Sequence, residues 1–202
     1  MYIPNHYQLD ETEIPSFISN HPFATLISMA EDGPMVNYAP LIFDAPNNCL
    51  IGHLANNNAQ LKLMDANSQI TVIFHGPDGY VSPNWYKDIT QVPTWNFAAV
   101  EIKGRASLLT SKNDKIQLLE ELTNFHENRI NSDWKIDKLP AEKLEAMLSA
   151  ISGFKIQIDS IKGKAKLSQN KSLAERSRVI EGLKALKDGK ADDLAKLMIS
   201  LT

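Results

Sequence analysis

Two apolar, β-branched segments flank a strong turn sequence near the start of this chain, and this pattern most constrains its fold. Residues 23–29 and 35–43 are joined by Glu31-Asp32-Gly33-Pro34, in which glycine and proline favour a reversal of the chain. The pattern predicts a β-hairpin. Because a hairpin pairs its strands in opposite directions, we expect the sheet to be antiparallel.

Further strand patterns follow along the chain. Residues 49–54 and 69–74 are apolar and β-branched, and residues 92–110 predict one long or bent strand with a bulge or corner at Gly104. Residues 153–159 alternate apolar and polar side chains, as a half-buried strand does. A curled, barrel-like sheet is therefore expected.

Helical spacing of apolar residues predicts helices between and after these strands. Ser111 and the sequence Ser172-Leu173-Ala174-Glu175 are typical helix starts. We expect Leu173, Ile180, Leu183 and Leu186 to share one buried face. The expected helices cover residues 12–20, 57–67, 111–126, 140–149, 172–189 and 192–201.

The size of the chain, 202 residues with 43% hydrophobic content, predicts one domain with a substantial core. The fold class expected is mainly β with added helices (α+β). A barrel core of about residues 21–110 and 153–168 carries a helical insertion of about 111–150 and C-terminal helices of about 172–201.

Composition argues against several classes of protein. A formal net charge of -3 and a pI near 6.0 provide no global attraction for nucleic acid. The single cysteine, Cys49, lies in an apolar run and predicts a buried residue in a reducing compartment. Neither a leader sequence nor a stretch of about 18 apolar residues is recognisable, so we expect a cytoplasmic protein without membrane attachment.

Familiar nucleotide and metal motifs are missing from the sequence. No Gly-x-Gly-x-x-Gly or Gly-x-x-x-x-Gly-Lys sequence occurs, which argues against Rossmann and P-loop sites. The five histidines are scattered and form no His-Glu-x-x-His pattern, so no metal site is predicted.

Polar residues are instead concentrated where predicted strands end. Residues 53–60, His-Leu-Ala-Asn-Asn-Asn-Ala-Gln, join a strand to a helix. Helix N-termini bind anions through free backbone N–H groups, to which histidine and asparagine add donors. The alternative interpretation is a helix cap without a ligand.

Three further segments are candidates for ligand binding. Residues 76–86 combine aromatics and prolines in a predicted rigid loop suited to a flat ligand, and residues 92–97 add hydroxyl, amide and indole groups. Residues 162–171 contain four lysines close to Ser168 and Asn170, which together can neutralise a phosphate. The alternatives are aromatics that plug the end of a barrel and a solvated, charged turn.

These segments together resemble the PaiB family, FMN-binding negative transcriptional regulators with an FMN-binding split-barrel fold. The resemblance covers almost the whole chain. Its motifs are Met1-Tyr2-Ile3-Pro4-x-His6-Tyr7, Gly52-His53-Leu54-Ala55-x-x-Asn58-x-Gln60, Phe74-His75-Gly76-Pro77, Tyr80-Val81-Ser82-Pro83-x-Trp85-Tyr86, Val92-Pro93-Thr94-Trp95-Asn96 and Lys166-Leu167-Ser168-Gln169-Asn170-Lys171. Asn37 and Glu101 stand where other members carry histidine, which weakens the case for catalysis or metal binding there.

The resemblance implies a six-stranded Greek-key split barrel that forms a homodimer, with FMN between the subunits. It also implies a flavin-dependent or flavin-sensing regulator, with residues 162–171, Arg176 and Arg178 as candidates for contact with DNA. The expected FMN-binding residues are His53, Asn56, Asn57, Gln60, Ser82, Trp85, Thr94, Trp95, Lys166, Ser168 and Asn170.

Two other functions stay open at the level of sequence. An FMN-dependent oxidoreductase would use NAD(P)H and a small acceptor, with the flavin supplying the redox chemistry. Catalytic residues are unknown, because Glu101 and His75 are only guesses for a general acid or base. A protein that stores or senses flavin or a haem-like ligand is the third reading.

Overall fold

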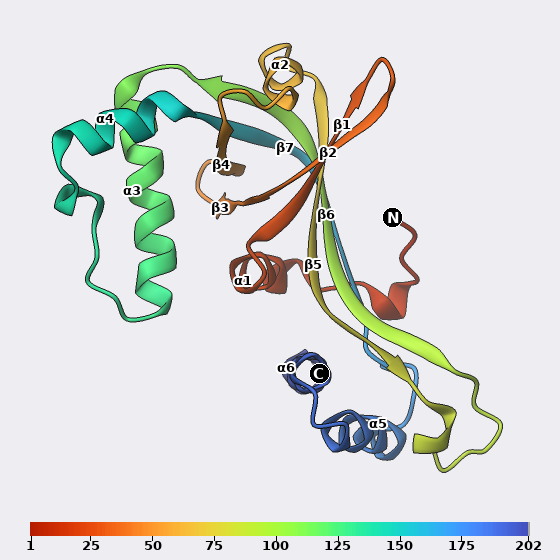
Figure 1. The fold of residues 1–202 in the computed structure, drawn as a ribbon. Helices are drawn as coiled ribbons and strands as arrows, with labels where there is room; N and C mark the ends of the chain where they lie inside the picture. Colours follow the sequence, from red (N-terminus) through yellow and green to blue (C-terminus); the bar gives the residue numbers. More distant parts are fainter. Residues whose placement is uncertain (202) are drawn as a thin grey trace. The chain divides into compact units, whose positions relative to one another are not determined.

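The computed structural model describes residues 1–201 as a long-stranded sheet with helices (Figure 1). The strands are β1 (Phe23–Ala30), β2 (Gly33–Pro40), β3 (Ile42–Asp44), β4 (Cys49–Ala55), β5 (Gln69–Val81), β6 (Thr94–Leu109) and β7 (Ile151–Lys166). The α-helices are α1 (Ile14–Asn20), α2 (Gln60–Asp65), α3 (Lys112–Arg129), α4 (Ala141–Ala150), α5 (Leu173–Ala185) and α6 (Gly189–Ser200). Short 3₁₀ turns are η1 (Asn5–Tyr7), η2 (Glu11–Glu13), η3 (Pro83–Trp85) and η4 (Ile136–Lys138).

The strands form one sheet in the order β2-β1-β5-β6-β7-β4-β3. The predicted hairpin is confirmed, because β1 and β2 pair antiparallel from Phe23 opposite Pro40 to Ala30 opposite Gly33. The sheet has seven strands where the family resemblance implied six. The expected strand 35–43 is in fact two strands, because the chain leaves β1 at Pro40 and β3 then pairs with β4.

Two segments expected to be loops belong largely to strands. β5 continues to Val81 and β7 continues to Lys166, so residues 76–81 and 162–166 are extended. In β7, the exposed or half-buried Lys162, Lys164 and Lys166 alternate with the buried Gly163 and Ala165. The prolines and the lysine density misled the prediction, since residues 162–166 of β7 bury only the small Gly163 and Ala165.

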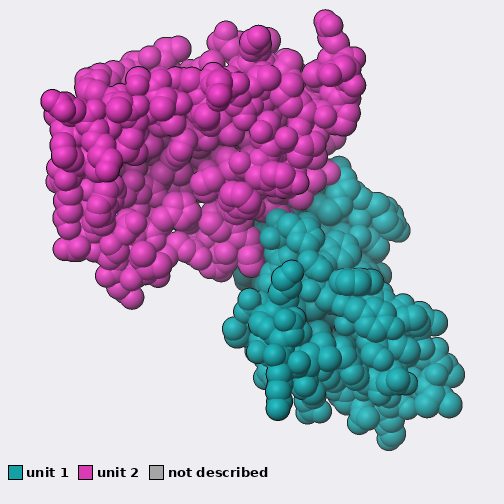
Figure 2. All heavy atoms as spheres, in the orientation of Figure 1, with its two compact units in different colours: residues 1–17, 75–100, 162–202 teal, residues 18–74, 101–161 magenta. Residues whose placement is uncertain are grey.

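The chain forms two compact units (Figure 2). Unit 1 comprises residues 1–17, 75–100 and 162–202, and unit 2 comprises residues 18–74 and 101–161. β5, β6 and β7 each contribute residues to both units. The expectation of a single domain over residues 1–202, with the internal boundaries given above, stays a prediction.

Unit 2 is built on the paired strands β2–β1–β5 and β3–β4–β7. Leu26 of β1 lies opposite Val72 of β5, and Leu50 of β4 lies opposite Ile156 of β7. All four side chains are fully buried. Burying an aliphatic side chain of this size contributes roughly 1.5–3 kcal/mol, so these cross-strand pairs are a major part of the stability of the unit.

Helices α3 and α4 supply the second layer of unit 2. Ser111 caps α3, because its hydroxyl accepts a hydrogen bond from the Asp114 backbone N–H at 3.0 Å, as the sequence predicted. The α3 residues Leu118 and Leu122 pack with Cys49 and Ile51 of β4, so Cys49 is a core residue. On its other side, Leu119 packs against η4 and α4.

Gly104 of β6 is explained by a close approach inside unit 2. A Cβ atom at this position would lie 2.2 Å from the backbone oxygen of Gln157, which no side chain tolerates. The strand runs through Gly104 without interruption, and close backbone contact accounts for this glycine. The bulge or corner expected there stays a prediction.

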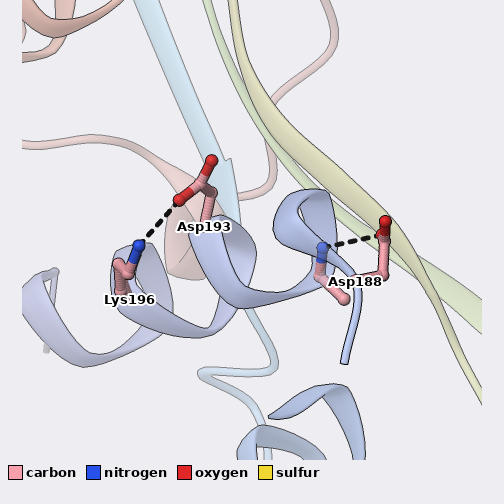
Figure 3. Close-up of polar contacts among 4 residues, drawn as sticks. Asp188, Asp193 and Lys196 are labelled. Atoms are coloured by element: carbon pink, nitrogen blue, oxygen red, sulfur yellow. Dashed lines mark hydrogen bonds and ion pairs between the residues drawn. The ribbon is translucent and has the colours of Figure 1, made fainter. Parts of the chain in front are cut away.

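Unit 1 contains the helical pair α5 and α6. Ser172 caps α5 by accepting from the Glu175 N–H at 3.3 Å, which confirms the predicted helix start. Asp188 caps α6 by accepting from the Ala191 N–H, and Asp193 pairs with Lys196 at 2.9 Å (Figure 3). No helix within residues 1–201 is long and apolar enough to cross a membrane.

The buried face of α5 differs from the predicted one. Leu173 and Leu186 are exposed, whereas Val179, Leu183 and Arg176 are buried. The Arg176 guanidinium donates to the backbone oxygens of Leu167 and Met198. It therefore satisfies one of the free carbonyls at the end of α6, a role that apolar periodicity does not reveal.

Candidate functional site

A small polar cavity in unit 1 brings together four of the expected FMN-binding residues. Its volume is about 150 Å³. Thr94 comes from the start of β6, Lys166 from the end of β7, and Ser168 and Asn170 from the segment that leads to α5. The other lining residues were not among the expected FMN-binding residues, although all but Gln91 lie in the family motifs; they are Tyr7, Tyr86, Gln91, Val92, Asn96 and Lys171.

The floor of this cavity is fixed by a buried hydrogen-bonded pair. Asn96 donates from Nδ2 to Ser168 Oγ at 2.9 Å, and both side chains are buried. Ser168 has a φ of 63°, in the left-handed region that is unfavourable for residues other than glycine. Such strain persists only where the surroundings hold it in place, and it is common at binding sites.

Two lysines give the cavity a positive charge. Lys166 Nζ donates to Thr94 Oγ1 and to the backbone oxygen of Trp95, while Lys171 Nζ donates to Gln91 Oε1. Burial, followed by repulsion from Lys164, lowers the pKa of Lys166. An anion in the cavity would stabilise the charged form of Lys166 and so offset both effects, and the electrostatics therefore favour a ligand such as phosphate.

The three remaining candidates of unit 1 lie outside this cavity. Trp85 packs over Gly182 of α5, since a Cβ atom there would lie 2.4 Å from the indole ring. Ser82 caps η3 by accepting from the Asn84 N–H at 3.3 Å. Trp95 is 55% exposed and meets Tyr80 edge-on at 6.2 Å between ring centroids. Trp95 thus offers an accessible aromatic surface.

The candidates of unit 2 do not form a common pocket. Gln60 is fully buried and donates to Ser28 Oγ at 2.9 Å while accepting from Asn37 Nδ2 at 2.9 Å. Asn58 donates to Asn37 Oδ1 at 3.0 Å and accepts from the Gln60 backbone N–H. We call Ser28, Asn37, Asn58 and Gln60 the amide network. Its polar groups already bond to one another.

The other three candidates near β4 have different surroundings. Asn56 is exposed and accepts from Ser152 Oγ at 2.6 Å and donates to the Ser149 oxygen, which ties the end of β4 to the junction of α4 and β7. Asn57 is exposed to solvent. His53 faces a separate, larger cavity lined by α3 and α4, and burial lowers its pKa.

The strand arrangement and the polar cavity define an antiparallel split-barrel fold with added helices, the class predicted from sequence. Similar solved structures include the FAD and heme binding protein from Mycobacterium smegmatis, with a TM-score of 0.63 and 13% identity over 86% of this chain and 79% of that one. The flavocytochrome Anf3 from Azotobacter vinelandii has a TM-score of 0.63 and 17% identity, over 87% of this chain and 78% of that one. At these identities the likeness establishes the fold alone.

The chain belongs to the family described as "Putative FMN-binding domain", whose model matches residues 1–160. It is also 35% identical over 206 residues to "Protease synthase and sporulation protein PAI 2" of Bacillus subtilis strain 168, covering 98% of this chain and 96% of the relative. The predicted PaiB-type family and the predicted cofactor, FMN, are confirmed. The family match ends before Lys166, so the assignment of the unit 1 cavity depends on its geometry and charge.

Sequence reasoning missed residues that reach the cavity from distant segments. Tyr7 comes from η1 and Gln91 from the connection between β5 and β6. Tyr7 ends the first family motif, but that motif contains no group that indicates a ligand, and Gln91 lies outside the motifs. Lys171 was recognisable, because it ends the motif that contains Lys166, Ser168 and Asn170.

Proposed function

We propose that this protein is a flavin-responsive transcriptional regulator, which binds the phosphate end of FMN in the unit 1 cavity and acts as a homodimer. The observation that carries the proposal is the donor set of the cavity. Two lysines, a strained serine hydroxyl and an asparagine amide surround a space of about 150 Å³. Charge-assisted hydrogen bonds from such groups are the strongest that proteins offer to a phosphate.

We assign the phosphate and ribityl parts of FMN to this cavity of about 150 Å³ and the ring to the surface outside it. Val92 at the mouth is 71% exposed and provides an apolar surface for a ring edge. Trp95 follows Thr94 directly on β6, and successive side chains of a strand point to opposite faces. We therefore assign Trp95 to the second side of the sheet, where a partner subunit would use it. Ser82 and Trp85 are assigned structural roles.

Unit 2 has an exposed apolar surface that would suit contact with a second copy of the chain. The register of β1 and β2 places Phe23, Met29, Val36 and Tyr38 on one face, and their exposed fractions are 65%, 67%, 47% and 62%. The opposite face carries the buried Ala24, Leu26 and Ser28. Exposed apolar faces of this kind mark protein–protein contacts.

A charged substitution tests this surface. We expect Val36→Lys to shift the protein from dimer to monomer in sedimentation equilibrium, because it places a charge in an apolar contact. Glu31→Lys, in the exposed turn of the same hairpin, serves as the matched control and is expected to stay dimeric. A wild-type protein that sediments as a monomer would contradict the homodimer.

Contact with DNA would use exposed cations of unit 1. Lys162 and Arg178 are exposed, whereas Arg176 is buried by its two backbone acceptors and takes no part. Lysine and arginine on one surface attract phosphate groups without reading sequence. Regulation by flavin would then depend on how FMN binding changes the access to this surface.

The decisive experiment measures flavin and DNA together. Purified protein is titrated with FMN by fluorescence quenching, and it is then used to select fragments from a genomic library with and without FMN. The proposal expects saturable quenching and a change in the selected fragments with flavin. Failure to bind any fragment in either state, together with steady oxidation of NADH or NADPH, would favour the oxidoreductase alternative.

A further inference from the structure

Helix α5 holds a segment that forms part of the wall of the unit 1 cavity. We call residues 86–92, which lie between η3 and β6, the rim segment. Tyr86, Gln91 and Val92 of this segment line the cavity. Residues 86–92 belong to no helix or strand, so their backbone groups need partners from other elements.

The carboxylate of Glu175, in the first turn of α5, supplies such partners. Its oxygens accept hydrogen bonds from the backbone N–H of Lys87, at 2.9 and 3.1 Å, and from that of Asp88, at 3.2 Å. Bonds from backbone N–H groups to a carboxylate are stronger than bonds between neutral groups. In addition, Arg178 Nε donates to the Trp85 backbone oxygen at 3.1 Å. Helix α5 therefore bonds to the main chain on both sides of the first residue of the rim segment.

The rim segment in turn holds Lys171, one of the two lysines assigned to the phosphate. Lys171 Nζ donates to Gln91 Oε1 and lies 5.8 Å from the centre of the Tyr86 ring. Gln91 is itself oriented, because its Nε2 donates to Asp88 Oδ2 at 2.5 Å. A lysine stem is long and flexible, so these contacts decide where the Lys171 ammonium lies.

We propose that Glu175 is a positioning residue for FMN, which fixes the rim segment so that Lys171 is held at the phosphate position. The inference rests on the proposed function, because it takes the unit 1 cavity as the phosphate site. The charge of Glu175 has the opposite effect, since a carboxylate repels a phosphate. Position and charge therefore predict opposite changes in FMN affinity when this carboxylate is removed.

The test replaces Glu175 by glutamine in the full chain. Glutamine is also favoured three positions after a serine cap, so the start of α5 at Ser172 is kept. Its amide has one acceptor oxygen, and the NH₂ group cannot accept from the second backbone N–H. We expect FMN affinity, measured by fluorescence quenching, to fall roughly fivefold, the effect of losing one net hydrogen bond.

Trypsin provides a second measurement that does not require FMN, because it cleaves after Lys87 in the rim segment. Cleavage requires the backbone to leave its bonded conformation, so we expect it to be faster in Glu175→Gln, as followed by mass spectrometry of the fragments. Glu181→Gln removes an exposed carboxylate from the same helix and is the matched control. Its cleavage rate and FMN affinity should stay close to wild type.

A second variant tests the same contacts from outside α5. Asp88→Ala, at an exposed position, removes the carboxylate that orients Gln91. It should also weaken FMN binding, although it too removes a negative charge. This variant replaces Glu175→Gln if that protein fails to fold.

Equal cleavage rates in Glu175→Gln and Glu181→Gln would overturn the inference. So would FMN affinity in Glu175→Gln that equals or exceeds the wild-type value while Lys166→Met binds FMN more weakly. Either result would leave the phosphate site in place. If Lys166→Met also keeps the wild-type affinity, the phosphate lies elsewhere, and the proposed function fails together with the inference.

Discussion

Two polar-rich regions that look alike in sequence differ in their charge and in the space that they enclose. The amide network of unit 2 bonds to itself, and Gln60 at its centre is fully buried. The unit 1 cavity instead surrounds open space with lysine, serine and asparagine side chains. A cluster of amides can thus form part of a closed core, whereas cations around a cavity need an anion to balance their charge.

The largest effect is expected from removal of the Gln60 side chain, which tests whether the amide network stabilises the core. We expect Gln60→Ala to lower the free energy of unfolding by about 2–4 kcal/mol, because it leaves a hole and unsatisfied groups on Ser28 and Asn37. Urea unfolding measures the change. Asn57→Ala, at a nearby exposed position, should stay within about 0.5 kcal/mol of wild type. Unchanged stability with lost FMN affinity would instead make Gln60 a flavin ligand.

In the unit 1 cavity we expect substitutions to lower FMN affinity and to leave stability nearly unchanged. Lys166→Met keeps the apolar stem and removes the charge, so FMN affinity should fall roughly tenfold, with little effect on unfolding. Lys171→Met should behave similarly. Fluorescence titration at two salt concentrations measures both variants. Lys103→Met, an exposed lysine of unit 2, is the matched control. Equal affinities in all three variants would place the phosphate elsewhere.

The smallest expected effect is a dependence of stability on pH that arises from two histidines of unit 2. The pKa values of His53 and His126 are lowered in the folded state, chiefly by burial. Below about pH 6.5, the usual histidine pKa, the unfolded chain takes up protons that the folded chain refuses. Stability should therefore decline from pH 7.5 to 5.5.

The decline should be shallower in the double variant His53→Gln/His126→Gln, as measured by the urea midpoint at each pH. His75→Gln removes an exposed histidine and should follow the wild-type slope. A double variant with the wild-type slope would show that neither histidine resists protonation.

Much of the fold was predictable because local signals agreed with the final structure. The hairpin at Gly33, the cap at Ser111 and the cap at Ser172 all lie where turn and capping chemistry placed them. Strand ends were less predictable. Lysines on β7 alternate with small buried residues, a pattern with too little apolar surface to indicate a strand.

The candidate site was predictable in part, and for a physical reason. Lys166, Ser168 and Asn170 are close in sequence, so one motif revealed them together. Tyr7 and Gln91 reach the same cavity only through the fold. The sequence also gave no sign that Gln60 is enclosed, since burial depends on which strands surround α2. The assignment of individual residues to FMN stays a prediction.

The bond from Arg176 to the Met198 carbonyl has a consequence for synthesis of the protein. All residues of unit 2 have been made once the ribosome passes position 161, whereas unit 1 combines the first 17 residues with the C-terminal segment. The guanidinium meets its second acceptor only when α6 has emerged. Nascent chains therefore complete unit 2 first, and in a chain truncated before Met198 the Arg176 guanidinium would keep only the Leu167 oxygen as an acceptor.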